Sequence, residues 1–186
     1  LADYLTINIS SPNTENLRSF HNEEELSELL SLIEKEKKIL KTSVPIAVKI
    51  SPDIDDNNIN IISDLLLKYS VEAVIISNTT DKNRENLSNI NKLEKGGLSG
   101  KPLENRSNEL INKFYKILKN KIKIIGVGGV DSGQSAYQKI INGASLVQLY
   151  TGMIYQGPKI ASKISKELIN ILDKEGAKNI SDVVGS

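Results

Sequence analysis

The first apolar run of the sequence ends in a group of small polar side chains, which is the clearest indication of a functional site. The run reads Ile-Asn-Ile-Ser-Ser-Pro-Asn-Thr over residues 7–14. A strand that ends in this way cannot bury Asn8, Ser11 and Asn13 without partners, because each unpaired buried polar group costs about 1–3 kcal/mol. A second run, Ile-Ile-Ser-Asn-Thr-Thr over residues 75–80, has the same character. The two runs predict a site at strand ends for a polar ligand.

Lys49 interrupts an otherwise apolar run over residues 46–50. A strand of a parallel sheet is covered on both faces, so a lysine within it needs a negative partner. The alternative is a lysine whose ammonium reaches solvent at the end of the strand. Because polar segments surround this position, an anionic cofactor or substrate is the better explanation.

Two glycine-containing turns point to a phosphate. The Gly-Val-Gly-Gly run at residues 126–129 precedes a helix start at Ser132 and could present backbone N–H groups to an anion. It is not a dinucleotide fingerprint, because Asp131 occupies the third glycine position. A tight turn alone explains the run equally well. However, residues 150–152 form a second such turn, with Thr151 placed to cap the next segment, and paired turns of this kind form the phosphate site of a (β/α)₈ barrel.

Other polar groups have simpler explanations. Ser11 has only His21 as a base within this sequence, so a Ser-His-Asp hydrolase is poorly supported. His21 itself is interpreted as a solvated turn residue. The carboxylates Asp53, Asp55 and Asp56 resemble a metal loop, but negative charge is favourable at a helix N-terminus, and they are interpreted as the cap and first turn of the next helix. No metal is expected.

The composition limits the partners. The chain has 186 residues, a formal net charge of +1, two Phe, no Trp and no Cys. The charges form no basic stripe, so no nucleic-acid partner is expected. No apolar run approaches the roughly 20 residues of a membrane span. The sequence begins with Leu1 and enters a strand almost at once, so we expect an upstream portion.

Alternating strands and helices must position these groups. Strands are predicted at residues 5–9, 46–50, 73–77, 123–127 and 146–150, and helices from residue 22 and over residues 56–68, 107–119, 132–141 and 158–174. Such a pattern gives right-handed βαβ units whose strand ends meet on one face. The predicted fold class is α/β, a (β/α)₈ TIM barrel represented by about its last five βα units. An open doubly wound sheet is the alternative. The long interval between Thr80 and Leu103 suggests a ligand-covering segment.

Six blocks resemble dihydroorotate dehydrogenase, in order and over nearly the whole chain. They are NISSPNT at residues 8–14, VKISPD at 48–53, SNTT at 77–80, GGLSGKPL at 96–103, IIGVGGV at 124–130 and GASLVQLYT at 143–151. The resemblance implies an FMN-containing TIM barrel that oxidises dihydroorotate to orotate in pyrimidine biosynthesis. It also implies that residues 1–186 are the C-terminal part of a single FMN-binding domain.

The resemblance assigns roles residue by residue. Ser11 matches the catalytic base, which takes the ring C5 proton as the C6 hydride passes to the flavin. Asn8, Asn13, Asn78 and Thr79 match residues around the orotate and the flavin. The cofactor-binding positions are Asn8, Lys49 beside the flavin N1/O2 edge, Ser77, Gly100, Gly129, Tyr150 and Thr151, the last three around the phosphate.

A serine at position 11 indicates the quinone-dependent subclass, because the fumarate- and NAD-linked members carry cysteine there. That subclass is membrane-associated through an N-terminal helical segment that also forms the quinone tunnel. The expected location is peripheral, on the cytoplasmic face of a bacterial inner membrane, or alternatively on the mitochondrial inner membrane. Two rival functions stay open: another FMN barrel, such as a dihydropyrimidine or dihydrouridine reductase, and a non-catalytic remnant that binds a phosphorylated ligand.

Overall fold

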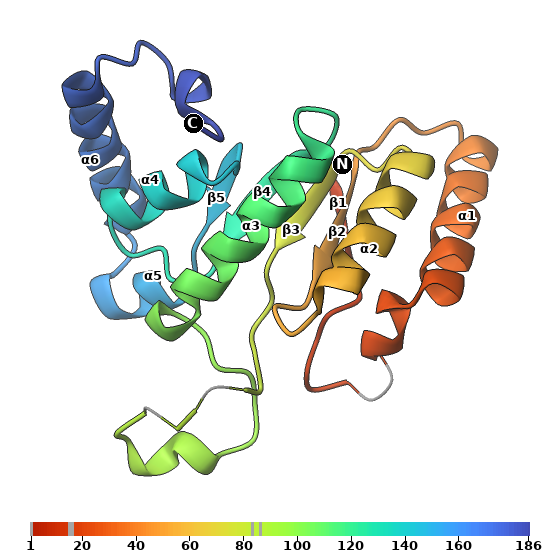
Figure 1. Ribbon diagram of the computed structural model, residues 1–186, viewed down its shortest axis with the longest axis horizontal. Helices are drawn as coiled ribbons and strands as arrows, with labels where there is room; N and C mark the ends of the chain where they lie inside the picture. Colours follow the sequence, from red (N-terminus) through yellow and green to blue (C-terminus); the bar gives the residue numbers. More distant parts are fainter. Residues whose placement is uncertain (1, 15–16, 83, 86) are drawn as a thin grey trace.

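Five parallel strands form the centre of the molecule in sequence order (Figure 1). The computed structural model describes residues 2–14, 17–82, 84–85 and 87–186. The strands are β1 (Leu5–Asn8), β2 (Ile46–Ile50), β3 (Ala73–Ile76), β4 (Lys123–Val127) and β5 (Leu146–Gln148). Each strand pairs with the next one in sequence, which confirms the predicted βαβ order.

In the described part of the chain, six α-helices connect and flank these strands. They are α1 (Glu23–Ile39), α2 (Asp56–Lys68), α3 (Glu104–Leu118), α4 (Gly133–Ile141), α5 (Thr151–Gln156) and α6 (Ile160–Glu175). Three of them begin at side-chain caps that the sequence predicts. Asn22 accepts from the Glu25 N–H, Asp55 from the Asn58 N–H and Ser132 from the Ser135 N–H. These caps pair N–H groups that a helix start otherwise leaves unsatisfied.

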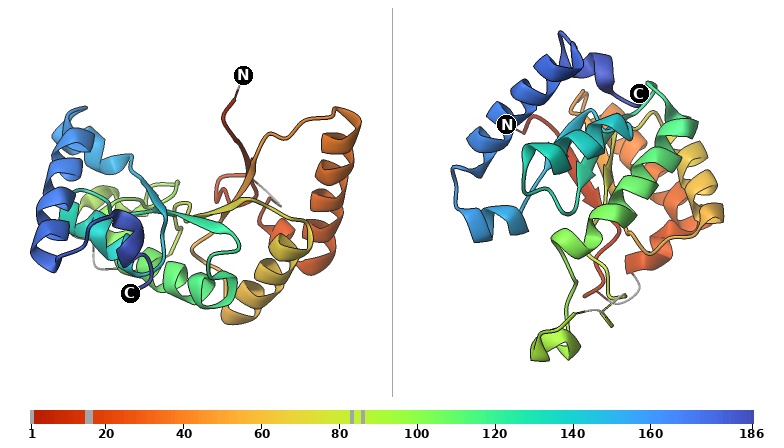
Figure 2. Two further views of the ribbon diagram at one scale, coloured as in Figure 1. Left: turned by 90° about the horizontal axis from the view of Figure 1, so that it is seen from above. Right: turned by 60° about the vertical axis from the view of Figure 1, so that its left-hand side comes forward.

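The strands and helices form an arc with a thick outer layer (Figure 2). The main apolar core lies between the strands and helices α1 to α3, and side chains such as Leu66, Val74 and Phe114 are fully buried there. On the inner face only Ala47, Ile75 and Ile125 form a small buried cluster. Because alternate strand residues point to opposite faces, Lys49 lies on the inner face with Ala47.

Several predicted boundaries differ from the structure: β1 and β3 end one residue earlier than predicted, β5 ends two residues earlier, and the last helix begins at Ile160, two residues later. Helix α3 begins at Glu104, three residues before the predicted start, because a 3-10 turn at Lys101–Leu103 leads directly into it. Thr151 is not a cap: it is the first residue of α5, and the cap position is Tyr150, which makes no side-chain cap bond. The predicted α/β class is confirmed. Among the described residues, no helix is both long and apolar enough to cross a membrane.

Candidate functional site

A cavity of about 850 Å³ opens at the carboxyl ends of β2 to β5. Eight of the eleven predicted site residues line it: Lys49, Ser77, Asn78, Thr79, Gly100, Gly129, Tyr150 and Thr151. They come from four strand ends and from the segment before α3, so the parallel topology gathers them as expected. The three that do not line the cavity are Asn8, Ser11 and Asn13, all from the end of β1 and the segment after it.

A cluster of amides and hydroxyls joins that segment to the cavity. Asn78 Nδ2 donates to Asn8 Oδ1 at 3.3 Å and to Ser10 Oγ at 3.0 Å. Ser10 Oγ donates to Asn8 Oδ1 at 2.8 Å. The strand ends of β1 and β3 are not neighbours in the sheet, so these bonds bridge over β2. The structure thus brings Asn8 and Asn78 together, 70 residues apart in sequence.

Ser11 and Asn13 lie beside the cavity in a turn. The Asn13 N–H donates to Ser11 Oγ at 3.2 Å. Asn13 lines a neighbouring cavity of about 710 Å³ together with Pro12 and Gly96. A Cβ at Gly97 would collide with Thr79 Oγ1 and would lie 3.3 Å from Pro12 Cγ. The Ser11 turn and the segment before α3 therefore approach one another at Gly97.

Lys49 is a cation for which the described residues provide no counterion. Within the described part of the chain, its ammonium makes no ion pair or hydrogen bond. Burial lowers the pKa of Lys49 from its ordinary value. Its half-buried side chain lines the large cavity. An anionic or electron-rich group bound there would supply the missing partner.

The glycine turn after β4 is constrained from two sides. Gly128 and Gly129 have φ angles of +115° and +78°. A Cβ at Gly129 would collide with Glu104 Cβ and would lie 2.9 Å from Glu104 Cα. Glycine is therefore required by the packing of α3 as well as by any close ligand approach. After the adjacent strand β5, Thr151 Oγ1 lies 2.8 Å from Ser99 Oγ.

His21 is a buried structural residue, so the interpretation as a solvated turn residue is wrong. Its side chain is 6% exposed. The Ser51 N–H donates to Nε2 at 3.2 Å, and Nδ1 lies 2.9 Å from the Arg18 carbonyl oxygen. Since an N–H can only donate and a carbonyl can only accept, the ring is neutral with its proton on Nδ1. Burial lowers the pKa of His21, the Arg18 carbonyl bond raises it and the Arg18 charge lowers it.

Asp53 also departs from its interpretation. Asp55 and Asp56 occupy the cap and first turn of α2 as predicted. Asp53 instead pairs with Arg18 Nη2 at 3.1 Å and accepts from Thr80 Oγ1 at 2.5 Å. Arg18 also donates to both oxygens of Asp81 at 3.2 Å. Arg18 thereby links the segment after β1 with those after β2 and β3, a role that its sequence position alone does not reveal.

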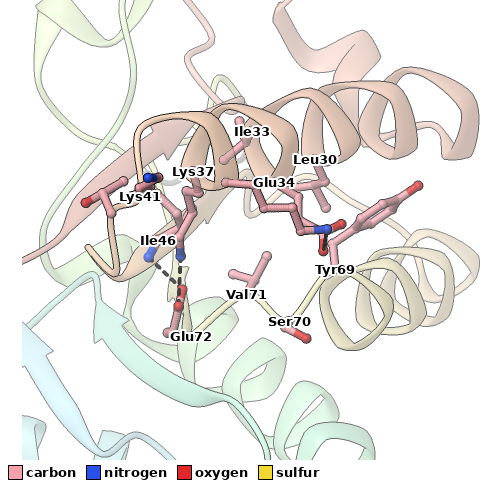
Figure 3. Close-up of a pocket in the computed structure, with 12 residues that line it drawn as sticks. Leu30, Ile33, Glu34, Lys37, Lys41, Ile46, Tyr69, Ser70, Val71 and Glu72 are labelled. Atoms are coloured by element: carbon pink, nitrogen blue, oxygen red, sulfur yellow. Dashed lines mark hydrogen bonds and ion pairs between the residues drawn. The ribbon is translucent and has the colours of Figure 1, made fainter.

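A second cavity lies at the opposite ends of the strands (Figure 3). It has a volume of about 390 Å³ and lies near the end of α1 and the starts of β2 and β3. Glu72 accepts there from Lys37 Nζ at 3.0 Å and from the Ile46 N–H at 2.7 Å. None of the predicted site residues lines this cavity, so the chemistry predicted from the sequence belongs to the carboxyl ends of the strands.

Comparison with known proteins gives one consistent match. A family model described as dihydroorotate dehydrogenase matches residues 1–172. The chain is 43% identical over 193 residues to a dihydroorotate dehydrogenase (quinone) of Trichodesmium erythraeum, covering 98% of this chain and 50% of that protein. It is 41% identical to the mitochondrial dihydroorotate dehydrogenase (quinone) of Mus musculus, covering 100% of this chain and 47% of that protein.

A solved structure shares the arrangement of elements. The dihydroorotate dehydrogenase of Eimeria tenella, crystallised in complex with ferulenol, aligns with a TM-score of 0.95 at 36% identity. The alignment covers 99% of this chain and 54% of that one. The chain thus spans about half the length of the curated relatives and solved structures that it matches.

Proposed function

The chain belongs to the dihydroorotate dehydrogenase family, and we propose that the protein containing it oxidises (S)-dihydroorotate to orotate in de novo pyrimidine biosynthesis, with a quinone as electron acceptor. The observation that carries this proposal is that the Asn8–Asn78 pair meets Lys49, a cation unpartnered within the described part of the chain, at one end of the sheet. Amides suit the carbonyl and N–H groups of a pyrimidine ring, and the cation suits a group that gains negative charge on reduction.

We propose FMN as the cofactor, and the residues present fit it. The large cavity combines the Lys49 cation, which has no counterion among the described residues, with the glycine turn at Gly128–Gly129 and hydroxyls from Ser77 and Thr151. Gly129, Tyr150 and Thr151 would hold the phosphate, Ser77 and Gly100 would contact the cofactor, and Lys49 and Asn8 would contact the flavin ring. When bound, FMN supplies the hydride acceptor and passes the electrons on to the quinone.

The protein's own groups bind the substrate and take its proton. Asn8, Asn13, Asn78 and Thr79 would orient the ring of dihydroorotate through hydrogen bonds. Ser11 would accept the proton from C5. Because a neutral hydroxyl is a weak base, Ser11 must pass this proton onward through a hydroxyl or water relay.

The remaining proposals concern the whole protein. Residues 1–186 would form the C-terminal part of a single FMN-binding domain. The quinone would be reached through a segment outside these residues. We propose a peripheral location on the cytoplasmic face of a bacterial inner membrane, with the mitochondrial inner membrane as the alternative. The substrates are then dihydroorotate and quinone, with no metal and no nucleic acid involved.

Stopped-flow reduction of the flavin by dihydroorotate in the complete protein tests this function. Ser11→Ala should slow reduction by about 10²–10⁴-fold, the usual contribution of a general base, while FMN stays bound. Ser11→Cys should retain more activity, with a pH optimum shifted toward thiol titration near roughly 8.5. Dihydrouracil and dihydrouridine are the control electron donors. A wild-type protein that is reduced through these but not through dihydroorotate contradicts the proposal, and a Ser11→Ala rate within about threefold of wild type places the base elsewhere.

A further inference from the structure

A lysine is fully buried behind the proposed cofactor site. Lys139 lies on α4, and its side chain is 0% exposed. Its ammonium donates to Asn108 Oδ1 at 2.9 Å and to Ser107 Oγ at 3.1 Å, both on α3. Neither acceptor is charged. A buried ammonium without a contacting carboxylate is costly, so a lysine at this position requires an explanation beyond packing.

The ammonium fixes the direction of a hydrogen bond. Since an ammonium only donates, Ser107 Oγ must accept from Lys139, and its single proton is left for a carbonyl. The hydroxyl lies 2.6 Å from the Val127 carbonyl oxygen and 3.3 Å from that of Ile76. The shorter contact makes Val127 the acceptor. Lys139 thereby connects to the last residue of β4.

The Val127 carbonyl connects two parts of the proposed cofactor site, Ser77 and the glycine turn. It also accepts from the Ser77 N–H at 3.1 Å, across the gap between β3 and β4. The next residue along the chain is Gly128, which begins the glycine turn. One carbonyl oxygen therefore sets the spacing between Ser77 and the turn, and the Ser107 hydroxyl holds that oxygen from behind.

The packing around Lys139 leaves the ammonium little freedom. A Cβ at Gly126 would lie 2.9 Å from Lys139 Cδ, so the lysine stem passes directly over the β4 backbone. Burial lowers the pKa of Lys139 to about 8, against the attraction of the Glu104 carboxylate and with the repulsion of Lys101. At neutral pH the group therefore keeps its proton, and all of its hydrogen bonds are donated.

We propose that Lys139 is a positioning residue for the cofactor, acting through Ser107 and the Val127 carbonyl to fix the spacing between Ser77 and the Gly128–Gly129 turn. This inference rests on the proposed function, because it takes FMN to be the group held between these two walls. Lys139 does not itself line the cavity. Its effect on FMN must therefore pass through the hydrogen-bonded chain.

A double-mutant cycle on the complete protein tests the proposal. Apoprotein is titrated with FMN, and the dissociation constant is read from quenching of flavin fluorescence for wild type, Lys139→Met, Ser107→Ala and the double variant. We expect each single variant to bind FMN about tenfold more weakly, and the double variant to be about as weak as either one, because both remove the same link. Lys116→Met, an exposed lysine on α3, is the matched control and should bind like wild type.

The outcomes separate the two proposals. A wild-type protein that binds no FMN contradicts the proposed function. If the wild-type protein binds FMN, two results would overturn the proposed role of Lys139 and leave the proposed function standing. One is an FMN dissociation constant of the single variants within about twofold of wild type, and the other is a double variant in which the two single effects multiply. Ser107→Ala removes a single oxygen, so it tests the proposal even where Lys139→Met does not fold. Unchanged FMN affinity in Ser107→Ala would refute the hydrogen-bonded link from Lys139 to the Val127 carbonyl.

Discussion

Among single residues, Lys49 gives the most direct indication of a bound ligand, because its half-buried side chain lines the large cavity and its ammonium has no partner among the described residues. In Lys49→Met the strand keeps its volume but loses the only cation proposed beside the flavin. We expect flavin reduction in the complete protein to slow by about 10²-fold, because charge that builds up on reduction loses a fixed partner. Stopped-flow absorbance with dihydroorotate is the measurement. Lys123→Met, an exposed lysine at the start of β4, is the control. Unchanged FMN occupancy and reduction rate would mean that Lys49 only reaches solvent.

His21 makes the stability of the fold depend on pH. Its folded pKa lies below the ordinary value of 6.5. As the pH falls below about 6.5, the unfolded chain binds a proton that the folded chain does not yet bind, so the free energy of unfolding decreases until the folded pKa is reached. His21→Gln keeps a side-chain acceptor for the Ser51 N–H and should flatten this dependence. Urea unfolding of both proteins between pH 7.5 and 5 checks it, since shared carboxylate titrations cancel in the difference.

For single residues, the sequence predicts which residue types lie at the strand ends, but not which residues they contact. Asn78, Thr79 and Lys49 follow from their positions at strand ends, because parallel strands deliver such residues to one edge. The buried state of His21 does not follow, since it depends on a bond to Ser51, 30 residues away. Lys139 left a usable signal: with Ala136 and Ile140 it shares the helix face that packs inward, where a lysine is out of place.

At the scale of elements, Arg18 holds three connecting segments together. Its guanidinium contacts Asp53 after β2 and Asp81 after β3, while its own 3-10 helix, Leu17–His21, follows the Ser11 turn. Arg18→Ala leaves the mostly buried Asp53 carboxylate without its cation, so we expect the complete protein to lose about 1–3 kcal/mol of unfolding free energy.

Asp81→Asn is the matched control for Arg18. The Asp81 side chain is 52% exposed, against 10% for Asp53, so water can replace most of what the substitution removes. We expect a loss of under about 1 kcal/mol for Asp81→Asn. Urea unfolding measures both variants. Equal losses of unfolding free energy in Arg18→Ala and Asp81→Asn would show that the ion pair between Arg18 and Asp53 adds no stability of its own.

The regular elements were predictable because their signals are local, whereas the segment between β3 and α3 was not. Side-chain caps and apolar periodicity lie within a few residues of the helices that they define. The interval from Thr80 to Leu103 contains Asn83 and Asn86, which lie outside the described residues. Its described part is shaped by an antiparallel bridge between Thr80 and Leu98 and by Arg84, which donates to the Lys92, Glu94 and Gly96 carbonyls. Such individual long-range contacts have no periodic signature.

At the scale of the whole molecule, the arc buries one face of its sheet well and the other poorly. On the outer face of the sheet, helices α1 to α3 cover a continuous apolar core. On the inner face, the described residues form a cluster of only three buried side chains. Within the described residues, β1 and β5 each pair on one side only. The relatives are about twice as long as this chain. We therefore propose that the arc is a barrel segment whose inner face and two edges are completed by further strands.

We expect the 186-residue chain, expressed by itself, to associate through these edges. Leu146 at the edge strand β5 is 62% exposed and Leu5 on β1 is 46% exposed, and unpaired edges with apolar side chains pair with other chains. Leu146→Lys should weaken association, because charge on an edge strand opposes such pairing. Leu40→Lys is the control and should leave association unchanged, because Leu40 lies beyond the end of α1 and is 69% exposed. Light scattering coupled to size-exclusion chromatography over a range of concentrations measures the mass. A chain that stays monomeric throughout would contradict the expected association through the edges of β1 and β5.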